Sequence, residues 1–171
     1  MRSGATDIAL VREFLGEPCL VTEVIRREPL AAFMSTRHHL ADRDDLTVAD
    51  LRDETILVVP ADLAPGFHGL AARLCAARGF TPAQVVLSRP ESREPLLAHL
   101  RRHPRQLFLG PVSMASLTWE GVTHLPLLDP DARIDICIVT AAGTTSSTVE
   151  DAVAAIRDLA RSEGWLDAPA G

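Results

Sequence analysis

Residues 55–87 read TILVVPADLAPGFHGLAARLCAARGFTPAQVVL. The stretch begins with an apolar run, 55–59, that has the length and the β-branched content of a buried strand. Residues 68–78 then repeat apolar side chains at helical spacing, and Gly79 follows where helices commonly end. A second short apolar run covers 84–87. The stretch therefore predicts a strand, a crossover helix and a second strand.

The same alternation continues on both sides of this unit. Thr47 and Asp50 are spaced as the two ends of a capping box for a short helix over 48–51. Short apolar or alternating runs predict strands at 7–11, 20–25, 29–35, 106–109, 122–127 and 134–139. Helical spacing predicts helices from Ser88 or Ser92 to 102, over 113–117 and over 148–161. Strands that alternate with helices favour an α/β sheet with helical crossovers.

Composition narrows the class of protein. The 171 residues allow one domain or two small lobes that share a core. Because 17 basic residues face 23 acidic ones, the net charge is −6, and the chain lacks the basic face of a self-sufficient nucleic-acid binder. The densest basic stretch, 101–105, is expected to be a solvated helix end. No transmembrane run or signal-peptide pattern occurs, so we expect a cytoplasmic protein without a membrane partner.

The three cysteines form no CxxC pair, which favours reduced thiols. Cys75 occupies an apolar position of the predicted helix and Cys137 the middle of an apolar strand, so we expect both in the core. Cys19 follows Pro18 in a more polar stretch and is expected to be more exposed.

Histidines and serines offer little sign of catalysis. His38 and His39 form a doublet in a polar loop, and the other histidines add no ligand spacing, so we expect solvated side chains and no metal or cofactor. The chain has no G-x-S-x-G elbow, no Walker A motif and no G-x-G-x-x-G motif. The pairs His68 with Asp62 and His124 with Glu120 are the nearest titratable neighbours, and both are typical surface groups. We therefore expect no enzyme and no catalytic residue.

Two junctions that follow predicted strands favour ligand binding instead. Residues 60–66 follow the strand at 55–59, and residues 109–113 follow the next buried run. Ligands of open α/β sheets bind outside the carboxyl ends of strands. Loop amides there, together with the hydroxyls of Ser88 and Ser113, are suited to a small anion, although both junctions also read as ordinary structural turns. The small-residue loop 143–147 before the last helix has the same two interpretations.

Six short motifs occur in order along nearly the whole chain. They are DIALVR at 7–12, REPL at 27–30, RHHLA at 37–41, LTVADLRDE at 46–54, ARGFTP at 77–82, and GV at 121–122 with LPL at 125–127. Together they resemble the effector-binding domain of LysR-type transcriptional regulators, and their order carries the likeness, because none is decisive alone. The chain departs from the family at 98–111, where a glycine-rich segment is usual, and lacks the aromatic-Arg pair common after the strand at 134–139.

The resemblance implies an α/β fold of the type 2 periplasmic-binding-protein kind, with two lobes joined by two crossing strands. Residues 1–33 and 135–171 would form a partial first lobe, and residues 34–134 the inserted second lobe. Against the family pattern the first lobe is expected to be incomplete at its N-terminal side, and no DNA-binding domain is expected within the chain.

The resemblance also implies a function. The domain would sense a small, anionic metabolite in the cleft between the lobes, act within a homo-oligomer, and reach DNA only through a helix-turn-helix domain that this chain lacks. We expect the effector to contact Arg12, Pro60, Ala61, Gly66, Ser88 and Ser113. For Arg12, an ion pair with Glu13 or Glu17 is the alternative. A standalone binding protein of the same fold, or a small α/β enzyme, are the alternative functions.

Overall fold

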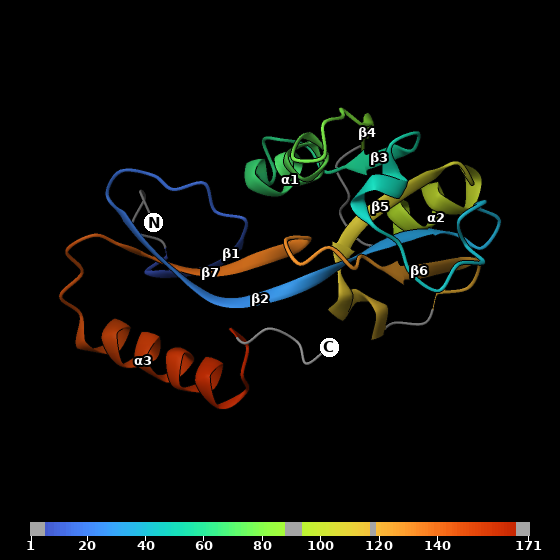
Figure 1. Ribbon diagram of the computed structural model, residues 1–171. Helices are drawn as coiled ribbons and strands as arrows, with labels where there is room; N and C mark the ends of the chain where they lie inside the picture. Colours follow the sequence, from blue (N-terminus) through green and yellow to red (C-terminus); the bar gives the residue numbers. More distant parts are fainter. Residues whose placement is uncertain (1–5, 88–93, 117–118, 167–171) are drawn as a thin grey trace. The chain divides into compact units, whose positions relative to one another are not determined.

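The computed structural model describes residues 6–87, 94–116 and 119–166 (Figure 1). Contacts divide the chain into two compact units, which we describe separately. Unit 1 consists of Met1–Glu28 and Ile134–Gly171, and unit 2 of Pro29–Arg133. Strand β2, Leu20–Ser35, contributes its first half to unit 1 and its second half to unit 2.

A mixed sheet in the order β6-β2-β5-β3-β4 forms the centre of unit 2. Its other strands are β3 (Thr55–Val58), β4 (Ala83–Val86), β5 (Gln106–Pro111) and β6 (Val122–Pro126). β3 pairs in parallel with both β4 and β5, whereas β2 pairs antiparallel with β5 and β6. The sequence prediction of a strand, helix and strand over 55–87 is therefore confirmed.

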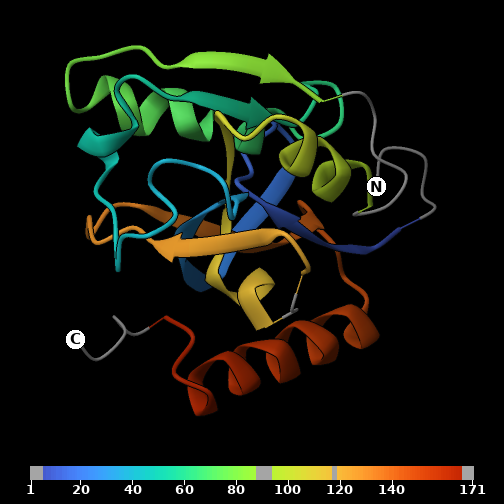
Figure 2. The same cartoon turned by 90° about the vertical axis from the view of Figure 1, so that its right-hand side faces the viewer.

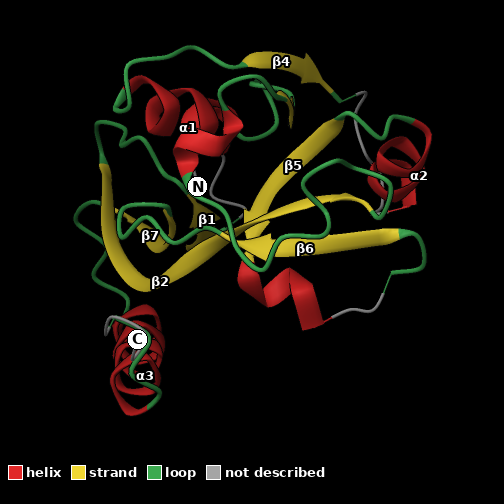
Figure 3. Ribbon diagram, turned by 45° about the vertical axis from the view of Figure 1, so that its right-hand side comes forward, coloured by secondary structure: helices red, strands yellow, loops and turns green. Residues whose placement is uncertain are grey.

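Two helices cover this sheet. α1 (Pro65–Ala76) connects β3 to β4, and α2 (Glu94–Arg102) leads from β4 back past β3 to β5. Because parallel crossovers are right-handed, two connections that run in opposite directions place their helices on opposite faces. Figure 3 shows α1 and α2 on the two sides of β5. α2 packs against the face that holds Phe33 and Phe108.

Two short 3-10 helices complete unit 2: η1 (Val48–Leu51) and η2 (Val112–Ser116). Asp50 Oδ2 accepts hydrogen bonds from the Thr47 amide at 2.8 Å and the Thr47 hydroxyl at 2.7 Å. The predicted interaction of Thr47 with Asp50 at the start of this helix is therefore present.

Unit 1 has a smaller sheet, in which β7 (Arg133–Ala141) lies between β1 (Ile8–Arg12) and β2. Helix α3 (Ser147–Ser162) lies along this sheet (Figure 2). Val149 and Val153 of α3 pack against Ile25 and Ile138 of the sheet. The helical spacing of residues 148–161 therefore predicted the side that faces the core.

Two predicted elements differ from the structure. The strands expected at 20–25 and 29–35 are one strand, because the charged segment between them does not interrupt it: Glu28 is buried and accepts from Arg26 at 2.8 Å. α1 begins at Pro65, three residues earlier than expected. Proline at the first helical turn is favourable, since that position needs no backbone N–H.

Candidate functional site

The carboxyl ends of β3 and β5 lie at the same edge of the unit 2 sheet. The two strands run in parallel, with Leu57 opposite Phe108. The segment that follows β3 carries Pro60, Ala61 and Gly66, and η2, which follows β5, carries Ser113. The structure therefore brings these four predicted residues to one edge, which we call the carboxyl edge. In open α/β sheets this is where ligands bind.

The segment after β3 leads into helix α1, whose N-cap residue has no polar side chain. The Pro60 carbonyl accepts hydrogen bonds from the amides of Leu63 and Ala64, which closes a turn. Ala64 is the N-cap of α1, its methyl side chain makes no capping hydrogen bond, and the first turn of the helix contains no acidic residue. The first amides of a helix have no intrahelical partner, so this end of α1 favours an anion.

Two hydrogen bonds hold the first turn of α1 in place. His68 Nδ1 donates to the Val59 carbonyl at 2.7 Å, so Nδ1 carries the ring proton. Arg73 donates to the Gly66 carbonyl at 3.0 Å. The Nδ1 proton of His68 is therefore used in a hydrogen bond to the backbone. His124 stacks on Phe33, with ring centroids 5.6 Å apart.

Apolar side chains surround the carboxyl edge. Leu63 is 53% exposed and Val112 is 37% exposed. In the same unit a cavity of about 10 Å³ is lined by apolar side chains that include Phe67 and Phe108. That volume holds about one water molecule. A ligand of unit 2 would therefore bind outside this cavity, against the exposed apolar residues.

The remaining predicted contacts have different positions. Ser113 is exposed in the first turn of η2, and its carbonyl accepts from the Ser116 hydroxyl at 2.9 Å. Arg12 is an exposed residue at the end of β1, opposite Ile136 of β7, and belongs to unit 1. Ser88 lies outside the described residues. The contact of Arg12 with a ligand stays a prediction.

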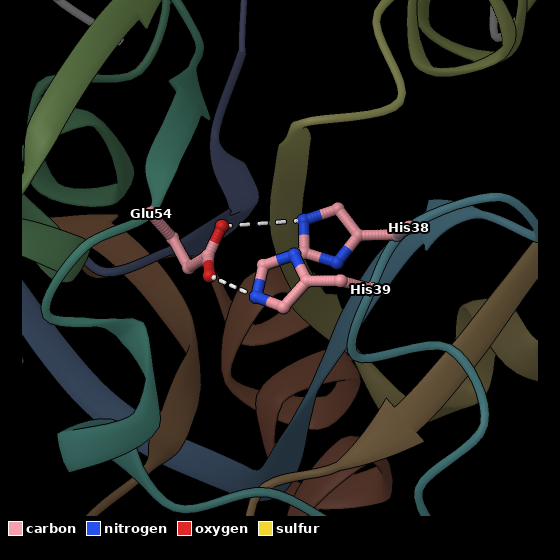
Figure 4. A group of neighbouring side chains, drawn as sticks. All are labelled: His38, His39 and Glu54. Carbon is pink, nitrogen blue, oxygen red and sulfur yellow. Dashed lines mark ion pairs between the residues drawn. The ribbon is translucent and has the colours of Figure 1, made fainter.

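The prediction of solvated side chains is wrong for His38. His38, in the loop after β2, and Glu54, just before β3, are 3% and 5% exposed. The Glu54 carboxylate faces both imidazoles from one side: its Oε2 is 3.3 Å from His38 Nε2 and its Oε1 is 3.0 Å from His39 Nε2 (Figure 4). Nothing local signals this burial, since the partner of His38 is 16 residues further along the chain.

The backbone fixes the proton on His38. The Leu40 amide donates to His38 Nδ1 at 3.2 Å, so the neutral ring carries its proton on Nε2, the atom that faces Glu54. Burial, together with nearby His39, lowers the pKa of His38 to about 4. Burial raises the pKa of Glu54, and His39 opposes that rise.

Two imidazoles and a carboxylate are a donor set that zinc accepts, and the three ligand atoms lie within 4.8 Å of one another. The geometry nevertheless opposes a shared ion. The His38 and His39 rings stack with centroids 4.6 Å apart and planes 23° apart, so their Nε2 atoms point side by side instead of converging. His38 Nε2 also carries the proton that metal binding would have to displace. The cluster therefore fits proton-linked hydrogen bonding better than a metal.

The cysteines lie as predicted. Cys75 and Cys137 are buried in the cores of the two units, and Cys19 is exposed. Burial raises the pKa of Cys75 to about 11, which keeps its thiol protonated near neutral pH. Among the helices of residues 6–87, 94–116 and 119–166, none has the length and apolar character to cross a bilayer.

The chain is similar to known bacterial regulators. It is 27% identical to the transcriptional regulator BenM of Acinetobacter baylyi over 172 residues, which covers 99% of this chain and 55% of BenM. It is 28% identical to the regulator AlsR of Bacillus subtilis over 79 residues, 46% of this chain and 26% of AlsR. The chain thus spans about half the length of BenM.

Solved structures agree with this likeness. A variant of the BenM effector-binding domain superposes with a TM-score of 0.81 at 25% identity, covering 99% of this chain and 78% of that one. The same domain with its effector benzoate gives 0.79 at 24%, covering 98% of this chain and 75% of that one. The expected periplasmic-binding-protein-like α/β fold is therefore confirmed. The family model named LysR substrate binding domain matches residues 1–161, and the chain belongs to this family of effector-binding domains.

Proposed function

We propose that the chain binds a small anion with an apolar body at the carboxyl edge of unit 2, and that this binding controls transcription in an intact regulator. The N-terminus of α1, which follows β3 along the chain and has an apolar N-cap residue, carries the proposal. Helix amides favour the anionic group, and exposed Leu63 and Val112 offer apolar contacts. The relative BenM, whose effector is benzoate, supports this class of ligand.

The proposed mechanism is a shift between conformations. A ligand that binds one conformation of the domain more tightly increases the population of that conformation. In the intact regulator the response reaches DNA through a helix-turn-helix domain outside this chain, and the domain works within a homo-oligomer. Unit 2 would serve as the inserted second lobe and unit 1 as part of the first, with boundaries at Glu28 and Ile134. In this role the chain performs no catalysis and acts in the cytoplasm.

An aspartate at the N-cap of α1 tests the site. In Ala64→Asp the new carboxylate would occupy the helix amides and repel an anion, so we expect affinity to fall by about tenfold or more. The same cap would stabilise the fold by about 0.5–2 kcal/mol, so weaker binding could not be attributed to unfolding. Calorimetric titration with benzoate and a panel of small mono- and dicarboxylates measures the effect.

The matched control is Ser146→Asp, which places the same charge at the N-cap of α3 in unit 1. Its affinity should equal that of the unmodified chain. Equal affinities for Ala64→Asp and the unmodified chain, or no binding of any member of the panel, would contradict the proposed site.

A further inference from the structure

The cluster of His38, His39 and Glu54 lies at the edge of the unit 2 sheet opposite the carboxyl edge. Met34 of β2 pairs with Leu107 of β5, and Thr55, the first residue of β3, pairs with Gln106, the first residue of β5. The two histidines follow β2 and Glu54 precedes β3. Glu54 therefore connects the two strands on either side of β5 at the point where β5 begins.

The three side chains of the cluster differ in their burial and in their hydrogen-bond partners, and both properties affect where a proton can bind. His38 has a fully buried ring, and its Nδ1 already accepts the Leu40 amide, so protonating that nitrogen would break a buried hydrogen bond. Among the described residues the buried His38 Nε2 atom has no hydrogen-bond partner, although Glu54 Oε2 lies 3.3 Å from it. The His39 side chain is 64% exposed, so its charged form keeps most of its hydration. The Glu54 side chain is 6% exposed and faces both rings.

We propose that these residues form a proton-operated clamp, in which the ionised Glu54 carboxylate holds both imidazoles and its protonation releases them, while His38 stays neutral throughout. The order of proton uptake is the unusual part. An imidazole normally takes up a proton at higher pH than a carboxyl group, and in this cluster the carboxyl group does so before the buried ring. The clamp is independent of the proposed function, because it lies at the opposite edge.

The surrounding charges support this order. The groups that act on the Glu54 carboxylate are His39, from the loop after β2, and Asp53, its neighbour in the chain. The group that acts on the His38 ring is His39, which disfavours a second positive charge. Burial of the carboxyl group and of the His38 ring favours the neutral form of each.

Release of the clamp loosens the loop that it holds. His38 anchors a turn through its carbonyl, which accepts from the Ala41 amide at 2.9 Å, and through Nδ1. When Glu54 is protonated, its contact with His39 is no longer an ion pair, and its remaining carbonyl oxygen attracts the Nε2–H of His38 more weakly than the carboxylate does. Amide protection should then fall in residues 36–43 and at the start of β3, and stay unchanged at the carboxyl edge.

A pH titration followed by NMR tests the clamp on the full chain. The side-chain carboxyl carbon of Glu54 and the ring nitrogens of His38 give separate titration curves, and amide exchange gives protection factors at each pH. We expect the Glu54 midpoint to lie above that of His38, and protection of residues 36–43 to fall by about tenfold at the Glu54 midpoint. His38 protonation at or above the Glu54 midpoint, or unchanged protection across it, would overturn the proposal.

Two variants, one control variant and a zinc titration extend the test. Glu54→Gln should give low loop protection that no longer changes with pH. Should that variant unfold, His39→Gln removes only the exposed ionisable group, and the Glu54 midpoint should then move to higher pH, because the charge that lowered it is gone. His103→Gln, at an exposed histidine after α2, should change neither curve. Zn²⁺ added alone should leave His38 and His39 unshifted, and a joint shift of both rings would replace the clamp with a metal site.

Discussion

The two halves of strand β2 have opposite environments. Residues 29–35 in unit 2 are buried almost throughout, whereas residues 20–28 in unit 1 are exposed or half-buried apart from Ile25 and Glu28. The same polypeptide strand therefore carries a two-sided core pattern and a one-sided pattern, and the change occurs at the boundary of the units. The backbone conformation is the same in both halves. The residue types differ because the two halves have different neighbours.

The neighbours of each half explain the difference. In unit 2 the strand pairs with β5 on one side and β6 on the other, and Phe33 lies in the core beneath α2. In unit 1, α3 covers the side that carries Ile25, and Val21, near the start of the strand on that same side, remains 53% exposed. Unit 2 should therefore contribute the larger share of the free energy of unfolding.

Truncation in the buried half should have the largest effect. Phe33 is 1% exposed and contacts the rings of Trp119 and His124, so Phe33→Ala should cost about 3–5 kcal/mol. Val21→Ala in the other half should change stability by less than about 0.5 kcal/mol. Urea unfolding of both variants measures the contrast. Similar losses for the two would break the comparison between the halves.

The pH dependence contributed by histidine should belong to unit 2 alone, because all six histidines lie between residues 38 and 124. The folded pKa of His38, about 4, is below the unfolded value of 6.5. Below pH 6.5 the His38 side chain therefore takes up a proton in the unfolded chain but not in the folded chain. The free energy of unfolding falls by about 3 kcal/mol as the pH drops from 6.5 towards 4. In His38→Asn this fall should be smaller by that amount, measured as urea midpoints across the range. An identical slope in both chains would contradict the assignment to His38.

Removal of the Asp129 carboxylate should have the next largest effect on stability, since this carboxylate links three segments of unit 2. It accepts from the Val48 amide at 2.6 Å and from Arg78, which follows α1, at 2.8 Å. Its side chain is 15% exposed. Asp129→Ala should therefore cost about 1–3 kcal/mol, because the buried Val48 amide loses its acceptor and Arg78, which also donates to Asp131, loses one of its two carboxylate partners. Thermal unfolding measures the loss, and no change in Tm would show that water replaces the carboxylate.

The ion pair between Arg157 and Glu23 in unit 1 should have the smallest effect on stability. Arg157 of α3 donates to both Glu23 oxygens, and both side chains are more than one-third exposed. Arg157 lowers the pKa of Glu23, so the pair stabilises the fold above pH 4.5 and its contribution is lost as pH falls below that value. Glu23→Gln should shift Tm slightly at low salt and not at high salt. A salt-independent loss as large as that of Asp129→Ala would reverse the order of the two units.

Local patterns predicted most elements, because strand and helix periodicity reflects the side that each element buries. The apolar run that became β3, the helical spacing of α3 and the buried Cys75 follow from such patterns. The sequence also contains a signal for the early start of α1, since Pro65 is typical of a first helical position.

Long-range partners could not be predicted in the same way. The burial of His38 depends on Glu54, and the continuity of β2 depends on the burial of Glu28 with Arg26. Charged residues and histidines in sequence read as solvent-exposed unless the fold supplies a partner. At the candidate site, the position after strand ends predicted the carboxyl edge, whereas the missing cap of α1 emerged from the three-dimensional structure.

The most direct test of the account is an amide chemical-shift map of the chain titrated with benzoate and the carboxylate panel. We predict that a binding anion shifts the amides of residues 60–68 and 109–116 in unit 2, with the largest change at the first turn of α1. Shifts centred elsewhere, or no shift from any member of the panel, would contradict the claim that the carboxyl edge of unit 2 is the ligand site of this domain.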